Sequence, residues 1–217
     1  MTIQSVNVTD VIAQIRAEAD IQDPSATSIC TDAELLVWVN KAYKRLYDLI
    51  AAEVGQEYFG VTASLAAPTF TLPADFYRAL GVDATIDGVP VSCRQFNFLE
   101  RNDFQWALRP RYRIYQGTLI WRPTASAPTT AVTLWYVPKP ATLAGNGAFD
   151  AVSGWDDYVV KYVVREVRRK QEYDLGEANA LLAEQLRVVQ HGASRLRESQ
   201  DQVADSTNIA DEAYYNG

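Results

Sequence analysis

Residues 154–170 read GWDDYVVKYVVREVRRK, and this stretch sets the expected fold class. Its apolar side chains recur at the spacing of one face of an α-helix. The apolar positions are Trp155, Tyr158, Val159, Tyr162, Val163 and Val167. Asp156 and Asp157 stand at the start, where a carboxylate interacts favourably with the helix dipole. We therefore expect a long helix that buries one face against other helices.

The same spacing predicts further helices on both sides of this stretch. One follows it over about residues 177–196, and two more lie within residues 1–56. The second N-terminal helix begins with Thr31 and Glu34, which fit a capping box. In that motif the threonine hydroxyl accepts a backbone N–H while the glutamate side chain reaches back to the cap. Helices are thus predicted on both sides of the middle of the chain.

The middle of the chain, residues 57–148, has a different pattern. Short runs of β-branched and aromatic residues are separated by Pro, Gly, Asp and Asn, which predicts strands. Asp87–Gly88 and Gln116–Gly117 supply hairpin turns, because glycine adopts a positive φ without steric cost. The expected strands are 59–65, 69–72, 80–86, 89–94, 111–115, 118–122 and 131–137. Strands joined by such turns should pair antiparallel.

These patterns together predict an α+β fold with four parts. A helical bundle forms from N- and C-terminal helices at residues 1–56 and 149–198, with an antiparallel β domain inserted at residues 57–148. Residues 199–217 are expected to form an extended C-terminal tail, because acids dominate there and apolar residues are sparse. Tyr214 and Tyr215 stand near its end. Two interpretations of the tail remain: a frayed terminus without a role, or a tyrosine anchor that orders in a partner's pocket.

Composition excludes several classes of protein. The 217 residues are 48% hydrophobic and 22% charged, which is typical of a soluble globular protein with a packed core. No apolar run reaches the ~18 residues of a membrane-spanning helix, and the N-terminus lacks the features of a signal peptide, so we expect synthesis in the cytosol. Cys30 and Cys93 lie far apart without metal-binding spacing, and we interpret both as small buried hydrophobes.

No motif indicates catalysis, a metal or a cofactor. The single histidine, His191, cannot build a multi-histidine centre, and phosphate-binding and hydrolase motifs are not found in the sequence. Asp156 and Asp157 are adjacent on a helix, so they point in different directions and cannot flank one glycosidic bond. We expect a protein that is not an enzyme, although an enzyme with an unfamiliar site remains an alternative.

Arginine is concentrated between Arg94 and Arg122. This segment contains six arginines and only two acidic residues, although the whole chain has a net charge of −7. Aromatic residues interleave with them, as in single-strand nucleic-acid binders, where bases stack on rings. Alternatively, the arginines point outward from strands and serve a protein interface while the rings point inward. The low pI of about 4.8 favours the protein interface. The candidate partner-contact residues, including a second cluster on the 154–170 helix, are Tyr214, Tyr215, Arg109, Arg111, Arg113, Arg165, Arg168 and Arg169.

Several phrases also occur in an order that resembles a known family. FTLPADFYR at 70–78 is followed by LGVD at 80–83, RYR at 111–113, LWYVP at 134–138 and GWDDYVVKY at 154–162. This order resembles the head-to-tail adaptor proteins of tailed bacteriophages, also called connector or head-completion proteins. The resemblance covers most of the chain and is weakest in the first thirty residues and the tail.

The resemblance implies a structural virion protein in the neck between head and tail, assembled in the host cytoplasm. Twelve copies would form a homo-oligomeric ring that joins the portal protein to a tail or nozzle protein and lets DNA pass as cargo. Twelve chains of net charge −7 carry −84 formal charges, and an acidic channel would repel DNA so that it slides. The resemblance implies no cofactor and no membrane, and places the tail with Tyr214 and Tyr215 at the portal. The alternatives are another tail-tube or nozzle subunit and a nucleic-acid-binding module that uses the Arg94–Trp121 region.

Overall fold

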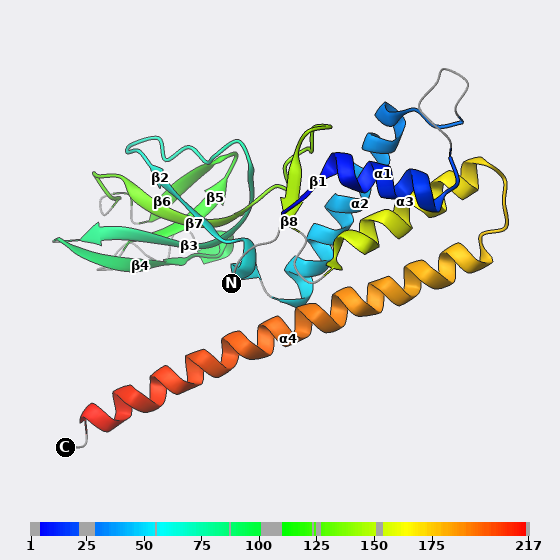
Figure 1. The fold of residues 1–217 in the computed structure, drawn as a ribbon. Coiled ribbons are helices and arrows are strands. Elements are labelled where there is room, and N and C mark those ends of the chain that lie inside the picture. The colour runs from blue at the N-terminus through cyan, green and yellow to red at the C-terminus, as the bar shows by residue number, and fades with distance from the viewer. Residues whose placement is uncertain are drawn as a thin grey trace. The chain divides into compact units, whose positions relative to one another are not determined.

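In the computed structural model the chain divides into two compact units (Figure 1). One unit combines Met1–Gly55 with Pro140–Gly217, and the other is Gln56–Lys139. The structure describes residues 5–21, 29–54, 56–86, 88–100, 110–122, 124, 127–150 and 154–215. Helices occupy both ends of the chain and strands its middle, so the predicted mixture of the two is confirmed.

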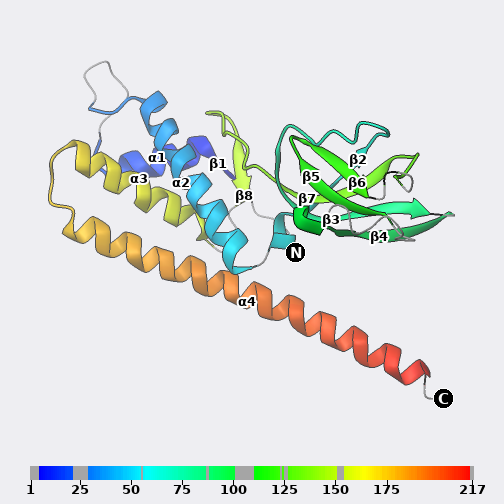
Figure 2. The ribbon, with the colours of Figure 1, turned by 180° about the vertical axis from the view of Figure 1, so that it is seen from behind.

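The first unit consists of four helices and a short two-stranded sheet. The helices are α1 (Val8–Glu18), α2 (Asp32–Glu53), α3 (Asp156–Lys170) and α4 (Gly176–Tyr215). The strands β1 (Ser5–Asn7) and β8 (Ala148–Asp150) pair antiparallel, and the sequence did not predict them. Figure 2, the view from behind, shows α4 running beside α2 and α3. Both α2 and α3 contact all three other helices, and α3, in which eight of 15 residues are buried, is the centre of this unit.

This central position explains the burial pattern of α3. Its apolar side chains are buried on more than the single face that the sequence predicted, because Val160 and Val164 join the predicted stripe. Val159, Val163 and Val167 are fully buried. Glu166 is buried as well, the one charged side chain so placed among the described residues. A helix surrounded by three others must be apolar over most of its circumference.

The capping box predicted at the start of α2 is half confirmed. The Thr31 hydroxyl accepts the backbone N–H of Glu34 at 3.3 Å. The Glu34 carboxylate, in contrast, accepts from the Lys170 ammonium at 2.7 and 2.6 Å. The glutamate side chain therefore links α2 to the end of α3.

The C-terminal residues differ from the extended tail expected at 199–217. In the structure α4 continues to Tyr215 without interruption. Neither proline nor glycine occurs between Gly192 and Gly217, so nothing in the sequence stops the helix. Extending an existing helix also avoids the cost of nucleating a new one. The prediction of an extended tail, which was based on polar composition alone, is therefore wrong for residues 199–215.

The second unit is a six-stranded sheet with the strand order β2-β7-β3-β4-β5-β6. The strands are β2 (Val61–Leu65), β3 (Phe76–Ile86), β4 (Val89–Gln95), β5 (Arg111–Tyr115), β6 (Thr118–Arg122) and β7 (Val132–Pro138). Short 3-10 turns occupy Gln56–Phe59 and Phe98–Glu100. Gly88 and Gly117 adopt positive φ in the two predicted hairpins. The prediction of a purely antiparallel β domain is wrong, because β4 and β5 pair in parallel.

The sheet curls so that its first and last strands approach each other. The segment after β2 bonds to β6: Leu119 N–H donates to the Phe70 carbonyl at 3.1 Å, and Leu72 N–H to the Gly117 carbonyl at 2.9 Å. Ten buried side chains fill the interior, namely Leu65, Phe70, Val82, Ala84, Tyr112, Leu119, Trp121, Val132, Leu134 and Tyr136. The curled sheet thus has one inner, apolar face and one outer face.

The LPADF phrase at 72–76 secures the end of this sheet. Phe76 N–H closes the turn onto the Pro73 carbonyl at 3.0 Å. The Asp75 carboxylate accepts the Tyr136 hydroxyl at 3.0 Å, and its carbonyl accepts Lys139 N–H at 2.6 Å. Burial, and then the Asp75 carboxylate, raise the pKa of Tyr136. The turn at Asp75 therefore also anchors β7.

Leucine truncation tests the assignment of the inner face. Leu134 on β7 is fully buried, whereas Leu99 is 81% exposed in the same unit. Leu134→Ala should lower the free energy of unfolding of the β unit by about 2–5 kcal/mol, because it leaves a cavity. Leu99→Ala is the matched control and should change it by less than about 0.5 kcal/mol. Urea unfolding followed by tryptophan fluorescence measures both, and equal effects would refute the assignment.

A pH dependence follows from the start of α3. Burial of the Asp156 carboxyl, with the neighbouring Asp157 charge, raises its pKa above the usual 3.8. The folded protein then binds this proton more tightly than the unfolded chain, so stability is lost as the pH rises through the folded pKa. Asp156→Asn should therefore raise the free energy of unfolding at pH 7 but not at pH 3. Asp10→Asn, at an exposed acid in the first turn of α1, is the control. Destabilisation by Asp156→Asn at pH 7 would contradict the prediction.

Candidate functional site

Ion pairs bind the predicted basic cluster of α3 to acids of the same unit. Arg169 lies 2.8 Å and Arg165 3.4 Å from the carboxylate of Glu166, and Arg168 lies 3.0 Å from that of Glu177. Glu166 is 4% exposed, whereas the Arg169 side chain is 62% exposed. A buried carboxylate needs such partners, because removal from water disfavours its charge. Of the three predicted arginines, Arg169 offers the most surface to a partner.

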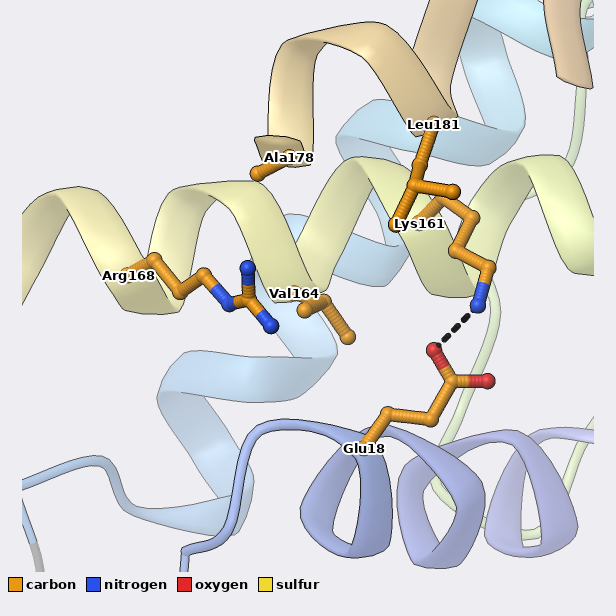
Figure 3. A pocket seen from close by; sticks show the side chains of 6 residues that line it. All are labelled: Glu18, Lys161, Val164, Arg168, Ala178 and Leu181. Carbon is orange, nitrogen blue, oxygen red and sulfur yellow. Dashed lines mark hydrogen bonds and ion pairs between the residues drawn. The ribbon is translucent and has the colours of Figure 1, made fainter. Parts of the chain in front are cut away.

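A small pocket lies between α1, α3 and α4 (Figure 3). Its volume is about 220 Å³. The lining combines Val164, Ala178 and Leu181 with the charged Glu18, Lys161 and Arg168. Figure 3 shows Lys161 reaching from α3 to Glu18 on α1, and this ion pair is 2.6 Å long. An apolar floor with a charged rim suits an inserted side chain of a protein partner.

The arginines of the β unit form a row across its outer face. Arg94 on β4 is the register partner of Arg111 on β5, and Arg111 is that of Arg122 on β6. Paired positions of neighbouring strands share one face, and alternate positions lie on the other. Tyr112 and Trp121, which alternate with these arginines, are buried in the core. For these residues the outward-arginine interpretation is confirmed, and neither ring is available for stacking on a base.

Three of these arginines lack a carboxylate partner. Among the residues that the structure describes, Arg94, Arg113 and Arg122 form no ion pair. The Arg113 guanidinium lies 5.0 Å from the centre of the Phe98 ring, and Arg122 donates to the Thr124 hydroxyl at 3.1 Å. We call Arg94, Arg111, Arg113 and Arg122 the arginine face. No described carboxylate balances the charge of Arg94, Arg113 or Arg122.

The remaining predicted contact residues lie elsewhere. Tyr214 and Tyr215 belong to the last turn of α4. Arg109 lies outside the described residues. The structure therefore groups Arg111 and Arg113 on β5, and Arg165, Arg168 and Arg169 on α3 in the other unit.

A second feature of the outer face was missed by sequence reasoning. The Asp83 carboxylate accepts the indole N–H of Trp135 through one oxygen and the Ser92 hydroxyl through the other, both at 2.7 Å. Trp135 is 45% exposed, and the hollow beside it, also lined by Gly60 and Gly81, has a volume of about 370 Å³. We call this hollow the Asp83–Trp135 pocket. The available signal was the alternation of β7, which puts tryptophan on the polar side of a strand.

The described residues include two cysteines, neither of them in a cluster of potential metal ligands. Cys30 is buried and Cys93 half-buried, and burial raises the pKa of both thiols. The prediction of a buried cysteine is thus confirmed for Cys30 and only partly for Cys93. No cluster of three potential metal ligands is found among the side chains that the structure describes. No described helix has the length and hydropathy needed to cross a membrane.

A family model described as SU10 adaptor protein matches residues 6–209. The match runs through both compact units and includes the arginine face and the Asp83–Trp135 pocket. Tyr214 and Tyr215 lie beyond it. Comparison with curated proteins finds no match.

Removing the buried acid tests the ion-pair assignment on α3. Glu166→Ala leaves Arg165 and Arg169 without their carboxylate and should lower the free energy of unfolding of the helical unit by about 1–3 kcal/mol. Glu166→Gln keeps the shape and one acceptor and should cost less. Glu184→Ala removes an exposed acid of α4 as the control. Urea unfolding followed by far-UV circular dichroism measures all three, and a Glu166→Ala midpoint equal to that of the control would refute the assignment.

Proposed function

The chain belongs to the SU10 adaptor protein family, a family of phage head–tail adaptors, and we propose that it forms a ring joining the portal to the tail. The ring contains twelve copies, and packaged DNA passes through its channel. The chain then acts as a structural protein of the virion neck, with the portal protein on one side and a tail or nozzle protein on the other. Assembly takes place in the host cytoplasm.

The family match carries this proposal, because it extends over residues 6–209 and so covers both compact units. Surface chemistry supports it. Arginine and tryptophan are enriched in protein interfaces, and the outer face of the β unit exposes both types of residue. A ring subunit needs such contacts on at least two of its surfaces, one for each neighbour.

The proposed ring subunit has two domains. We assign residues 1–56 and 149–198 to a helical bundle and residues 57–148 to a β domain inserted between its halves. The discontinuous helical unit, made from both ends of the chain, supports this division. Acidic charge on the channel wall would keep DNA mobile, since like charges repel.

The C-terminal part of α4 is the proposed portal contact. The acids between Glu198 and Glu212 have no base among them, and Tyr214 and Tyr215 follow directly. Tyrosine combines a large apolar ring with a polar hydroxyl, which suits it to a partner's pocket. The exposed Arg169 and its neighbours on α3 are a second proposed contact with virion proteins.

Truncation of α4 tests the portal contact. Deletion of residues 205–217 should leave both units folded, because Val189 and Ala193, buried positions of α4 among the described side chains, precede the deletion. Affinity for purified portal rings should fall by about tenfold or more, the loss expected from removing an interface anchor. Deletion of residues 216–217 alone retains the tyrosines and is the control. Unchanged affinity of the 205–217 deletion would remove the C-terminus from the portal contact.

The copy number tests the function itself. Quantitative mass spectrometry of purified particles should give a ratio of this chain to the portal subunit near one to one. The chain should be missing from unfinished empty heads if it is added after packaging. Absence from finished particles would overturn the proposal, and a sixfold assembly would indicate another tail subunit.

A further inference from the structure

The outer face of the β unit carries two charged features of opposite sign. Alternation along β3 and β7 places Val82 and Leu134 in the core, so Asp83 and Trp135 point outward. Ser92 on β4 is the register partner of Asp83 and shares its face. Arg94, two residues further along β4, begins the arginine row that continues across β5 and β6. The acidic pocket and the arginine face are therefore adjacent patches of one surface.

The Asp83–Trp135 pocket has the chemistry of a guanidinium site. Each Asp83 oxygen accepts one hydrogen bond from within the chain, and a carboxylate oxygen has two lone pairs, so each can accept another. Both donors, the Trp135 indole and the Ser92 hydroxyl, are neutral, so the negative charge is not compensated. The exposed indole ring offers a surface on which a guanidinium can stack. Arginine fits such a site best, because its planar fork donates two parallel hydrogen bonds to one carboxylate.

The pocket is also large enough for such a side chain. Its volume of about 370 Å³ is many times the ~30 Å³ of one water in the liquid. Two glycines, Gly60 and Gly81, line it, and a Cβ added to Gly81 would meet no atom within 4 Å. The backbone therefore leaves open space directly beside the carboxylate.

The part of the chain that the structure describes does not supply a cation to this site. Among the described residues Asp83 forms no ion pair, and neither do Arg94, Arg113 and Arg122. Arg94 lies on the strand next to Asp83 but is not within ion-pair distance of it. The Asp83 carboxylate and the Arg94 guanidinium thus lie on one face without forming an ion pair with each other. A second copy of the same chain supplies both complements at once.

We propose that one of Arg94, Arg113 and Arg122 on the arginine face of one copy inserts into the Asp83–Trp135 pocket of the next copy. Its guanidinium pairs with Asp83 and stacks on Trp135. Because the two features are different patches, a copy that fills its neighbour's pocket keeps its own pocket free for a third. Such head-to-tail contacts close into rings when the rotation between copies is suitable. The inference rests on the proposed ring and names the contact that holds it together.

Two neutral variants separate the halves of the contact. The pocket variant, Asp83→Asn/Trp135→Ala, keeps the arginines, and the arginine variant, Arg94→Gln/Arg113→Gln/Arg122→Gln, keeps the pocket. The control, Asp48→Asn/Tyr173→Ala, removes one exposed acid and one exposed ring from the helical unit. Thermal unfolding first verifies that each full-length variant is folded. Sedimentation velocity then measures assembly up to about 1 mM, which populates contacts with dissociation constants in the millimolar range.

The expected pattern is specific to a head-to-tail contact. Wild type and control form species larger than dimers, whereas each neutral variant alone remains monomeric. A one-to-one mixture of the two variants forms heterodimers and stops there, because only one productive contact can form.

Four outcomes would overturn the inference. These are assembly of either variant to the wild-type size, a mixture that stays monomeric, a wild type that stops at dimers, and a wild type that is monomeric at about 1 mM. None of them decides the proposed function, which the copy number in particles tests independently. A one-to-one ratio to the portal with a failed mixture would mean that another surface forms the ring.

Discussion

Burial of α3 on three sides is the constraint on which the helical unit depends. Its fully buried valines, such as Val163, provide a strong but non-directional attraction to α1, α2 and α4. Direction comes from three ion pairs at the edges of α3, each to a different helix: Lys161 to Glu18 on α1, Lys170 to Glu34 on α2 and Arg168 to Glu177 on α4. Partly exposed pairs contribute only about 0–1 kcal/mol each. Their effect is therefore to select one rotation and one axial position of each helix.

Local signals explain how much of this fold was predictable. Periodic apolar residues and glycine turns act within a few residues, so the helices, β2 to β7 and both hairpins were predicted close to their observed positions. The strand predicted at 69–72 is wrong, because this segment forms only an isolated bridge from Thr71 to Thr118. The parallel pairing of β4 with β5 was not, because no glycine turn joins these strands and nothing local sets their register. The helical C-terminus was missed for the opposite reason. Its polar composition does not favour a separate helix. These residues instead extend α4, which requires no new nucleation.

The candidate contact residues were predictable to a similar extent. Alternation along β5 and β6 was sufficient to place the arginines outside and the Tyr112 and Trp121 rings inside, whereas Tyr115 is 49% exposed. The Asp83–Trp135 pocket was not predictable, since its two principal residues are 52 positions apart in the sequence. They meet only because β7 lies beside β3 in the sheet. A site made by register between distant strands leaves no spacing signature in the sequence.

The length of α4 has a mechanical consequence. At 1.5 Å per residue, its 40 residues span about 60 Å, and Ala193, the last buried side chain among those the structure describes in α4, lies near the middle. The remaining turns act as a ruler in which each added or removed residue moves the end by about 1.5 Å and rotates it by about 100°. Insertions of seven residues, close to two whole turns, would preserve the azimuth of the terminal tyrosines while lengthening the rod. Under the proposed portal contact, the distance from the helical unit to its partner would therefore depend on the number of helical turns in this segment.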